Sequence, residues 1–333
     1  MCFYTTGTMD IRQNYALIGN APLFRQLLNT AQLVAATRAS VLIVGESGCG
    51  KENLARYLHA HSPLASRPFI AVNCANLPEN LVESELFGHR RGAFSNALSD
   101  RDGLVRTAHN GTLFLDEIGE LPLTAQAKLL RFLESGEILP LGCDRPIQVN
   151  VRVIAATNCN LEQMVKAGRF RTDLYYRLQV VPMEVPALRE RAGDIAQLAE
   201  HFINQAAQRH NLPAVSFSPE ALRVMRAYAW PGNIRELKNL CERLTILCHG
   251  QRQPLGAENL PFDLRDRPAV PLTQSAMSLE RHERDMIVHA LEQCKGNRTH
   301  AAKMLGITRY TLLYRIKKHF PSEAGLPGPG YLA

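Results

Sequence analysis

The spacing of apolar residues over the first half of the chain predicts helices that alternate with buried strands. Residues 23–36 carry leucine, alanine and valine at a helical period. Four short runs, at 41–45, 68–74, 111–117 and 151–157, are continuously apolar, as expected of strands covered on both faces. Helical segments lie between these runs, so we expect an α/β fold with a mostly parallel sheet flanked by helices.

After Pro186 the pattern becomes helical throughout. Segments at 194–210, 218–230 and 233–249 have a helical period and indicate a second, all-α unit. A stretch with several prolines and little apolar periodicity then predicts a linker. A last helical unit follows it.

The composition is that of an ordinary globular protein, with 46% hydrophobic and 21% charged residues. No segment has the apolar length of a membrane span, and the N-terminus lacks the pattern of an export signal. We therefore expect no membrane association and a cytoplasmic location. The eight cysteines are scattered without a CxxC pair, which gives no indication of a zinc or redox centre.

The net charge of +7 is unevenly distributed. Between Lys295 and Phe320 the chain carries seven basic residues and no acidic one. This run favours a polyanionic partner, and a solvated basic helix is its simplest alternative explanation.

The segment GESGCGK (45–51) stands between a predicted strand and a predicted helix, which is the context of a phosphate-binding loop. Its glycines let backbone amides turn toward phosphate groups, and Lys51 adds a full positive charge near the β- and γ-phosphates. The generic motif continues with serine or threonine, whereas Glu52 follows here.

Three other segments in this half of the chain carry polar residues that suit a nucleotide site. LFLDE ends in Asp116, expected to hold Mg²⁺ directly or through water, and Glu117, expected to polarise the attacking water. Asn158 ends the next strand and can sense a γ-phosphate. Arg171 and Arg177 are candidates for stabilising transferred phosphate from a neighbouring subunit, although a surface salt bridge is the simpler interpretation of that stretch alone.

Together these segments resemble the central domain of the bacterial enhancer-binding proteins, the AAA+ ATPases that activate transcription by the sigma-54 form of RNA polymerase. The resemblance covers about residues 17–250. It is carried by GESGCGKE, FIAVNCANLPENLVESELFGHRRGAF, NGTLFLDEIGELPLTAQAKLLRFLE, VRVIAATN, GRFRTDLYYRL, LRER and WPGNIRELKNL.

The resemblance implies an AAA+ P-loop ATPase with an all-α lid and a C-terminal Fis-type helix-turn-helix. The expected parts are a short N-terminal extension (1–16), the α/β ATPase subdomain (17–188), the helical lid (189–258), a linker (259–278), the helix-turn-helix (279–320) and a disordered tail (321–333). An active assembly of this kind is expected to be a hexameric ring.

The resemblance also assigns roles to single residues. Lys51 matches the Walker A lysine, Asp116 and Glu117 match the Walker B pair, and Asn73 matches the residue that restrains the catalytic glutamate. Arg171 and Arg177 match arginine fingers that reach the neighbouring subunit's nucleotide. The implied ATP site consists of Ile18, Gly19, Gly45, Glu46, Ser47, Gly48, Cys49, Gly50, Lys51, Glu52, Asn158 and the sensor II residue Arg235. Cys49 replaces the family threonine, which should matter little where the backbone binds the phosphates.

The C-terminal segment NRTHAAKMLGITRYTLLYRIKKHF (297–320) resembles the Fis-type DNA-binding module. Its inward positions are expected to be Ala301, Ala302, Leu305, Leu312 and Ile316. The expected DNA contacts are Thr308 and, toward base edges, Arg309, Tyr310 and Tyr314, with Arg298, Arg315, Lys317 and Lys318 nearer phosphates. A three-helix packing module without DNA is the alternative.

Two features depart from the family pattern. The ATPase segment begins within about twenty residues of Met1, so we expect regulation in trans, by a binding protein, by a partner subunit or by expression level. The family loop GAFTGA, which contacts sigma-54, reads Gly92, Ala93, Phe94, Ser95, Asn96 and Ala97 here.

Three functions remain open at this stage. The first is an ATP-driven activator whose altered loop still grips the sigma-54 holoenzyme. The second is an ATP-binding, DNA-binding regulator that acts without sigma-54, through another polymerase form or as a repressor. The third is a subunit of a mixed hexamer whose partner supplies intact loops. The sequence leaves the target genes, the DNA site and the controlling signal undetermined.

Overall fold

A computed structural model describes residues 17–94, 97–251, 253–261 and 297–304, together with Leu264, Leu291, Cys294, Leu312 and Ile316. The chain divides into two compact units, Met1–Arg267 and Pro268–Ala333. Each unit is described below by itself.

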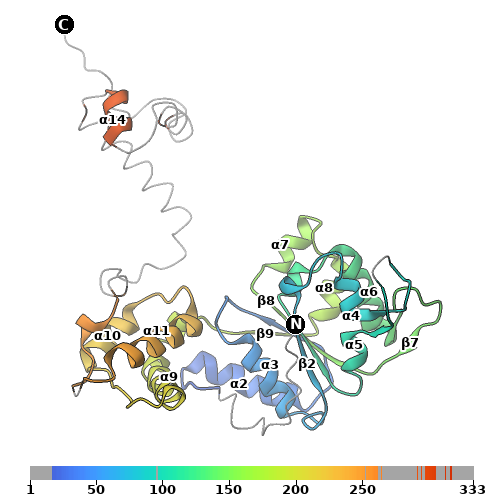
Figure 1. Cartoon of the computed structure of the whole chain (residues 1–333), viewed down its shortest axis with the longest axis horizontal. Helices are drawn as coiled ribbons and strands as arrows, with labels where there is room; N and C mark the ends of the chain where they lie inside the picture. The colour runs from blue at the N-terminus through green and yellow to red at the C-terminus, as the bar shows by residue number, and fades with distance from the viewer. Residues whose placement is uncertain are drawn as a thin grey trace. The chain divides into compact units, whose positions relative to one another are not determined.

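The first unit is built on a five-stranded parallel sheet in the order β2-β5-β8-β1-β9 (Figure 1). Its strands are β1 (Val41–Val44), β2 (Phe69–Asn73), β5 (Thr112–Asp116), β8 (Arg152–Thr157) and β9 (Val181–Glu184). The four predicted strands all form, and β9 is an addition. Because β9 pairs only with β1, it is an edge strand and can accommodate Pro182.

Helices cover both faces of this sheet, because successive strand residues point to opposite faces. Leu113 and Leu115 pack in one core, whereas Phe114 between them packs in the other. The second core is closed by α2 (Pro22–Ala35) and α3 (Lys51–Ala60). The first is closed by α4 (Val82–Phe87), α5 (Leu104–Thr107), α6 (Leu123–Ser135), α7 (Leu161–Lys166) and α8 (Thr172–Leu178).

Two short antiparallel ladders, which the sequence pattern did not reveal, project beside the first core. One pairs β3 (Gly88–His89) with β4 (Arg101–Asp102), and the other pairs β6 (Glu137–Ile138) with β7 (Ile147–Gln148). Leu141, between β6 and β7, donates its N–H to the Gly88 carbonyl and accepts from the Arg90 N–H, both at 2.9 Å. The two loops therefore share backbone hydrogen bonds.

The helical part of this unit consists of η3 (Leu188–Asp194), α9 (Ile195–His210), α10 (Pro219–Ala227), α11 (Asn233–Cys248) and η4 (Ala257–Asn259). Its core is centred on Trp230, whose side chain is fully buried and whose Nε1 donates to the Met225 carbonyl at 2.8 Å. Short turns η1 (Cys74–Asn76) and η2 (Ile118–Glu120) follow β2 and β5.

In the second unit the structure describes α14 (Arg298–Met304), which Asn297 caps by accepting from the Thr299 and His300 amides. Ala301, Ala302, Leu312 and Ile316 are buried, as predicted for the inward positions. Leu305 lies outside the described residues.

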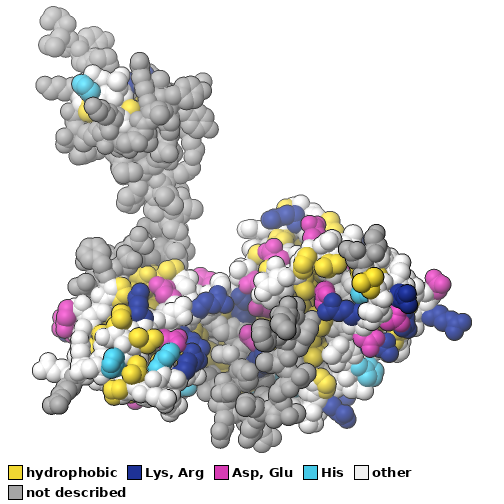
Figure 2. Space-filling model, in the orientation of Figure 1, with side chains coloured by type: hydrophobic (Ala, Val, Ile, Leu, Met, Phe, Trp, Pro, Cys, Tyr) yellow, Lys and Arg dark blue, Asp and Glu magenta, His cyan; other side chains and the backbone are white. Residues whose placement is uncertain are grey.

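Within the described residues, no helix is both long enough and apolar enough to span a bilayer. On the face of the first unit that Figure 2 shows, basic and acidic side chains are interspersed. The positive net charge therefore forms no single basic patch on that face.

Candidate nucleotide site

The phosphate loop joins β1 to α3 and bends at two glycines, Gly48 with φ +75° and Gly50 with φ +105°. Lys51 begins the helix, and only 6% of its surface is exposed. Its Nζ donates to the Gly45 carbonyl at 2.9 Å and to the Glu46 carbonyl at 3.3 Å. The ammonium group is thereby folded over the loop that is expected to bind phosphates.

The acidic pair lies directly beside this lysine. Glu117 Oε1 is 3.8 Å from Lys51 Nζ, and Glu117 Oε2 accepts from the Asn158 N–H at 3.3 Å. Glu117 has φ +52°, a left-handed conformation that is uncommon outside glycine and is enriched at functional sites. Burial, and then the charge of Glu117, raise the pKa of Asp116. The ends of β1, β5 and β8 thus bring together Lys51, Asp116, Glu117 and Asn158.

Asn73 stands at the end of β2, opposite Asp116 in the ladder. Its Oδ1 accepts from the Ala75 N–H at 2.9 Å and so caps η1. The structure therefore places Asn73 beside the acidic pair with its side-chain oxygen bonded to its own turn.

The lid contacts the phosphate loop through an ion pair. Arg189 of η3 donates from Nη1 to Glu46 Oε2 at 2.8 Å and from Nη2 to Glu46 Oε1 at 2.6 Å. The hydrogen bond from Arg189 is the main cause of the lowered pKa of Glu46. Arg189 was not among the residues predicted for the site, although it lies in the quoted segment LRER.

The start of α11 adds four further hydrogen bonds to the loop. Asn233 Nδ2 donates to Glu46 Oε2 at 3.0 Å and to the Ser47 carbonyl at 3.1 Å. The Ile234 N–H donates to the Gly48 carbonyl at 3.0 Å, and Arg235 Nη1 donates to Ser47 Oγ at 3.1 Å. Asn233 is fully buried with φ +51°, and sequence reasoning missed its role. The predicted sensor residue Arg235 is thus held at the edge of the loop.

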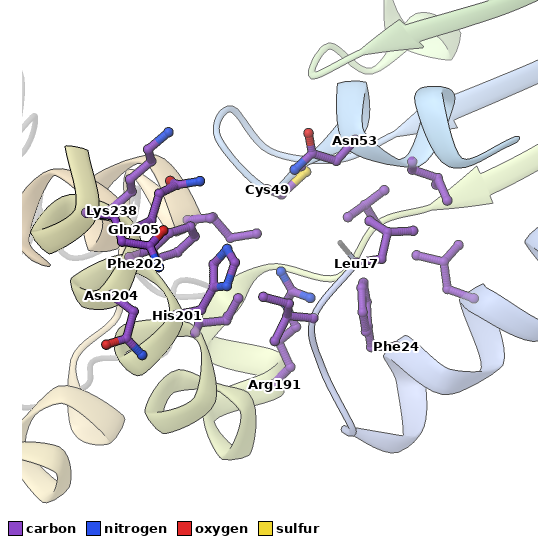
Figure 3. Close-up of a pocket in the computed structure, with 18 residues that line it drawn as sticks. Leu17, Phe24, Cys49, Asn53, Arg191, His201, Phe202, Asn204, Gln205 and Lys238 are labelled. Atoms are coloured by element: carbon purple, nitrogen blue, oxygen red, sulfur yellow. The ribbon is translucent and has the colours of Figure 1, made fainter. Parts of the chain in front are cut away.

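A cavity of about 460 Å³ opens beside the loop, between α2, α3 and the lid helices α9 and α11 (Figure 3). One wall is apolar and consists of Leu17, Ile18, Phe24, Leu27, Leu54 and Val185. Cys49, Gly50 and Asn53 connect this wall to the phosphate loop. Burial raises the pKa of the Cys49 thiol. Ile18 therefore lies where the resemblance implies an adenine pocket.

Gly19 is placed differently from its neighbour and does not line the cavity. A Cβ at this position would lie 2.5 Å from Asp194 Oδ2 and 2.6 Å from Phe24 Cδ1. Asp194 Oδ1 accepts from the Asn20 N–H at 2.6 Å and the Ala21 N–H at 3.0 Å. The absence of a side chain at Gly19 thus allows Asp194 of the lid to approach the start of α2.

The two candidate finger arginines lie on the exposed surface of α8 and at its start. Arg171 forms a two-point ion pair with Asp173, with Nη2–Oδ2 at 2.6 Å and Nε–Oδ1 at 3.1 Å. Arg177 Nη2 donates to the Leu133 carbonyl at 2.8 Å. The structure therefore contains the surface salt bridge that this stretch suggests by itself.

The candidate sigma-factor loop is closed at its base by backbone hydrogen bonds. The Gly92 N–H donates to the Ala97 carbonyl, and the Ala97 N–H donates to the Phe94 carbonyl, both at 2.9 Å. Ala93 is bonded back to Arg90, and its Cβ would lie 3.0 Å from a Cβ placed at Gly142.

Phe94 packs edge-on against His89, with ring centroids 5.0 Å apart, and the His89 ring is hydrogen-bonded to Ser84 at 2.7 Å. Ser95 and Asn96 lie outside the described residues.

The candidate DNA-contacting residues are mostly outside the described part of the chain. Arg298 lies in the first turn of α14. Thr308, Arg309, Tyr310, Tyr314, Arg315, Lys317 and Lys318 lie beyond what the structure describes.

Comparison with known families gives three consecutive matches. Residues 17–184 match the sigma-54 interaction domain, residues 189–276 the AAA+ ATPase lid domain, and residues 278–319 the bacterial regulatory protein, Fis family. The transcriptional regulatory protein ZraR and the regulatory protein AtoC of Escherichia coli (strain K12) are 45% and 43% identical. Each match covers 91% of this chain, and 69% and 67% of those proteins respectively.

The fold has close counterparts among solved structures. NtrX from Brucella abortus in complex with ADP superposes with a TM-score of 0.71 at 35% identity, over 93% of this chain and 70% of that one. NtrX in complex with ATP gives a TM-score of 0.69 at 36% identity, over 91% and 69%.

Proposed function

Because the chain belongs to the AAA+ ATPases that activate sigma-54-dependent transcription, with a helical lid and a Fis-type DNA-binding domain, we propose that it remodels the sigma-54 holoenzyme by hydrolysing ATP at the loop 45–51. Family membership favours this function over a regulator that acts without sigma-54.

The observation that carries the site assignment is the juxtaposition of Lys51 and Glu117, 3.8 Å apart at the ends of neighbouring elements. Lys51 holds the β- and γ-phosphates electrostatically. Glu117, oriented by its left-handed backbone and by the Asn158 N–H, aligns and deprotonates the attacking water. Asn73, one strand away, restrains Glu117 until the nucleotide is in place, and Arg235 senses it from the lid.

The acidic pair fits Mg²⁺ as the metal. Among the described residues no group of three or more histidine, cysteine or acidic side chains could hold an ion. This suits Mg²⁺, which takes one or two carboxylates and completes its shell with water and phosphate oxygens. Asp116 would hold it, directly or through water, and the bound ion would neutralise charge on the phosphates.

The exposed placement of the finger arginines supports assembly into a hexameric ring. Arg171 and Arg177 lie on an exposed surface and are hydrogen-bonded to Asp173 and to the Leu133 carbonyl respectively. In the ring each arginine reaches the nucleotide of the adjacent copy, where a positive charge stabilises the transferred phosphate.

Hydrolysis moves the loop at 85–98, and Phe94 transmits this motion to sigma-54 so that the closed promoter complex opens. The loop shares hydrogen bonds with Leu141, so the β6–β7 loop moves with it. The C-terminal helices bind an upstream DNA site in the cytoplasm.

The test is ATP-dependent open-complex formation by purified sigma-54 holoenzyme on a promoter that carries the protein's own upstream site. We expect open complexes with the parent protein and none with Lys51→Ala, which loses nucleotide binding, or Glu117→Gln, which retains bound ATP. Lys166→Ala, an exposed lysine outside the site, is the matched control and should behave as the parent. Equal hydrolysis by the parent, Lys51→Ala and Glu117→Gln would refute the site.

A further inference from the structure

The cavity beside the phosphate loop contains a buried arginine that the proposed mechanism does not use. Arg191 lines the cavity and is only 2% exposed. Its Nε and Nη1 have no hydrogen-bond partner among the described residues. A buried donor without a partner is costly, so a ligand that supplies an acceptor gains binding energy there.

The guanidinium group is fixed in position by an aromatic ring. Its Cζ lies 4.3 Å from the centroid of the Phe24 ring. Figure 3 shows Arg191 rising between Phe24 and His201 toward the open part of the cavity. A guanidinium stacked in this way is held with its N–H donors in one defined plane.

The neighbouring residue Arg189 points elsewhere because the backbone bends between the two. Arg191 has φ −127° and ψ 44°, which is outside the helical region, within the η3 turn. Arg189 therefore reaches Glu46 of the phosphate loop, whereas Arg191 lies in the cavity.

Asp194 is the acid whose charge acts on Arg191, and one of its two oxygens is engaged. Its Oδ1 accepts from the Asn20 and Ala21 amides, and neither its Oδ2 nor the Nε and Nη1 of Arg191 has a hydrogen-bond partner in the described structure. Burial lowers the pKa of Arg191 and the charge of Asp194 opposes this. The carboxylate thus favours the charged guanidinium without bonding to its Nε or Nη1.

The cavity itself selects the kind of ligand. Its apolar wall, which includes Ile18 and Leu54, suits the flat face of a ring, whereas the phosphates have the amides of the loop and Lys51 for partners. A planar heteroaromatic ring suits both that wall and the stacked arginine. Since Cys49 and Gly50 join the cavity to the phosphate loop, such a ring lies at the far end of a nucleotide from its phosphates.

We propose that Arg191 is the base-recognition residue of the nucleotide site, and that its in-plane Nε and Nη1 donors bond to the ring acceptors of the purine of the triphosphate. This inference rests on the proposed ATP site and adds the residue that selects the base.

The test compares the binding of base and of phosphate in Arg191→Met and Arg191→Lys. Methionine removes the charge and the donors, and lysine keeps the charge that Asp194 attracts but removes the planar group. We expect the KM for ATP to rise about tenfold in both variants, with kcat nearly unchanged. The preference for ATP over CTP in kcat/KM should fall by a similar factor. Inhibition by inorganic tripolyphosphate, which occupies only the phosphate loop, should stay as in the parent.

Arg226→Met, an exposed arginine on α10, is the matched control and should change none of these values. An unchanged KM and ATP preference in Arg191→Met would overturn the inference and leave the ATPase assignment intact. Equal weakening of ATP, CTP and tripolyphosphate would also overturn it, because Arg191 would then act only on the shape of the site. Failure of the proposed function itself would appear separately, as hydrolysis that survives in Lys51→Ala.

Discussion

Arg189 of the lid and Glu46 of the phosphate loop form a two-point ion pair, with nitrogen–oxygen distances of 2.6 and 2.8 Å. The pair joins segments 143 positions apart in the sequence, so it ties the position of the lid directly to the loop that binds phosphate.

Breaking this pair should loosen the lid. Both side chains are partly exposed, so we expect a coupling free energy of about 1 kcal/mol in a double-mutant cycle of Arg189→Met and Glu46→Gln, measured by urea denaturation. The KM for ATP should rise in each single variant. The same cycle on the exposed pair Arg106–Asp102 is the control, and its effect on KM should be absent. Zero coupling at Arg189–Glu46 would show that the pair is incidental.

Two features favour glycine at position 48. Its φ is positive, and the backbone of the lid approaches it closely. A Cβ there would lie 2.5 Å from the Gly232 carbonyl oxygen, whereas a Cβ at Gly168, with a similar φ of +69°, would meet nothing within 4 Å. We expect Gly168→Ala to cost about 1 kcal/mol of stability through backbone strain alone.

Gly48→Ala should lower the free energy of unfolding by more than Gly168→Ala does. It should also weaken ATP binding at least roughly tenfold, because the added Cβ displaces the lid. Equilibrium unfolding and nucleotide titration of the two variants separate the two effects. Equal losses in both variants would argue that strain is the whole cause.

His59 makes stability depend on pH. Burial, together with the charges of Arg152 and Arg56, lowers the pKa of His59 to about 4 from an ordinary 6.5. The unfolded chain therefore binds one more proton between these values, and the stability that neutral His59 provides is lost as pH falls from 6.5 to 4. The full loss is on the order of 3 kcal/mol.

The measurement is urea denaturation of the parent and His59→Gln at several pH values in this window. In His59→Gln, the slope of unfolding free energy against pH should be smaller than in the parent by the equivalent of about one proton. The control His249→Gln, at an exposed histidine, should keep the parental slope. A parental slope in His59→Gln would rule out this origin.

The sigma-factor loop offers a gain-of-function test. Ser95→Thr with Asn96→Gly restores the family sequence GAFTGA, adding a methyl worth about 0.8 kcal/mol if buried at the contact and removing a side chain that hinders close approach. We expect more open complexes at an unchanged rate of ATP hydrolysis. Sigma-54-dependent output that stays at zero in the restored variant would contradict the proposed engagement.

The sheet and the acidic pair could be predicted because their signals are local. Continuous apolar runs specify strands buried on both faces. A glycine loop after a strand, together with a pair of acids at the end of another strand, is typical of a phosphate and metal site. β9 escaped prediction because Pro182 argues against a strand, and only its position at the edge of the sheet makes that proline acceptable.

The lid contacts could not be predicted, because they depend on where distant segments meet. From sequence, Asn233 is typical of a turn, and only the fold brings Glu46 beside it. Likewise, the sequence LRER does not indicate that its two arginines contact different parts of the site. The sequence does not reveal that a side chain at Gly19 is excluded by Asp194 and Phe24, and the role of Gly19 in ATP binding stays a prediction. The roles of Asn73, Arg171 and Arg177 stay predictions.

The proline in β9 also affects the tendency of this chain to aggregate. An edge strand offers unpaired amides on which a second chain can build an intermolecular sheet, but a proline has no amide hydrogen to give. Pro182 interrupts that template at one side of the sheet. This edge is therefore less able to seed an intermolecular sheet when copies of the chain are concentrated.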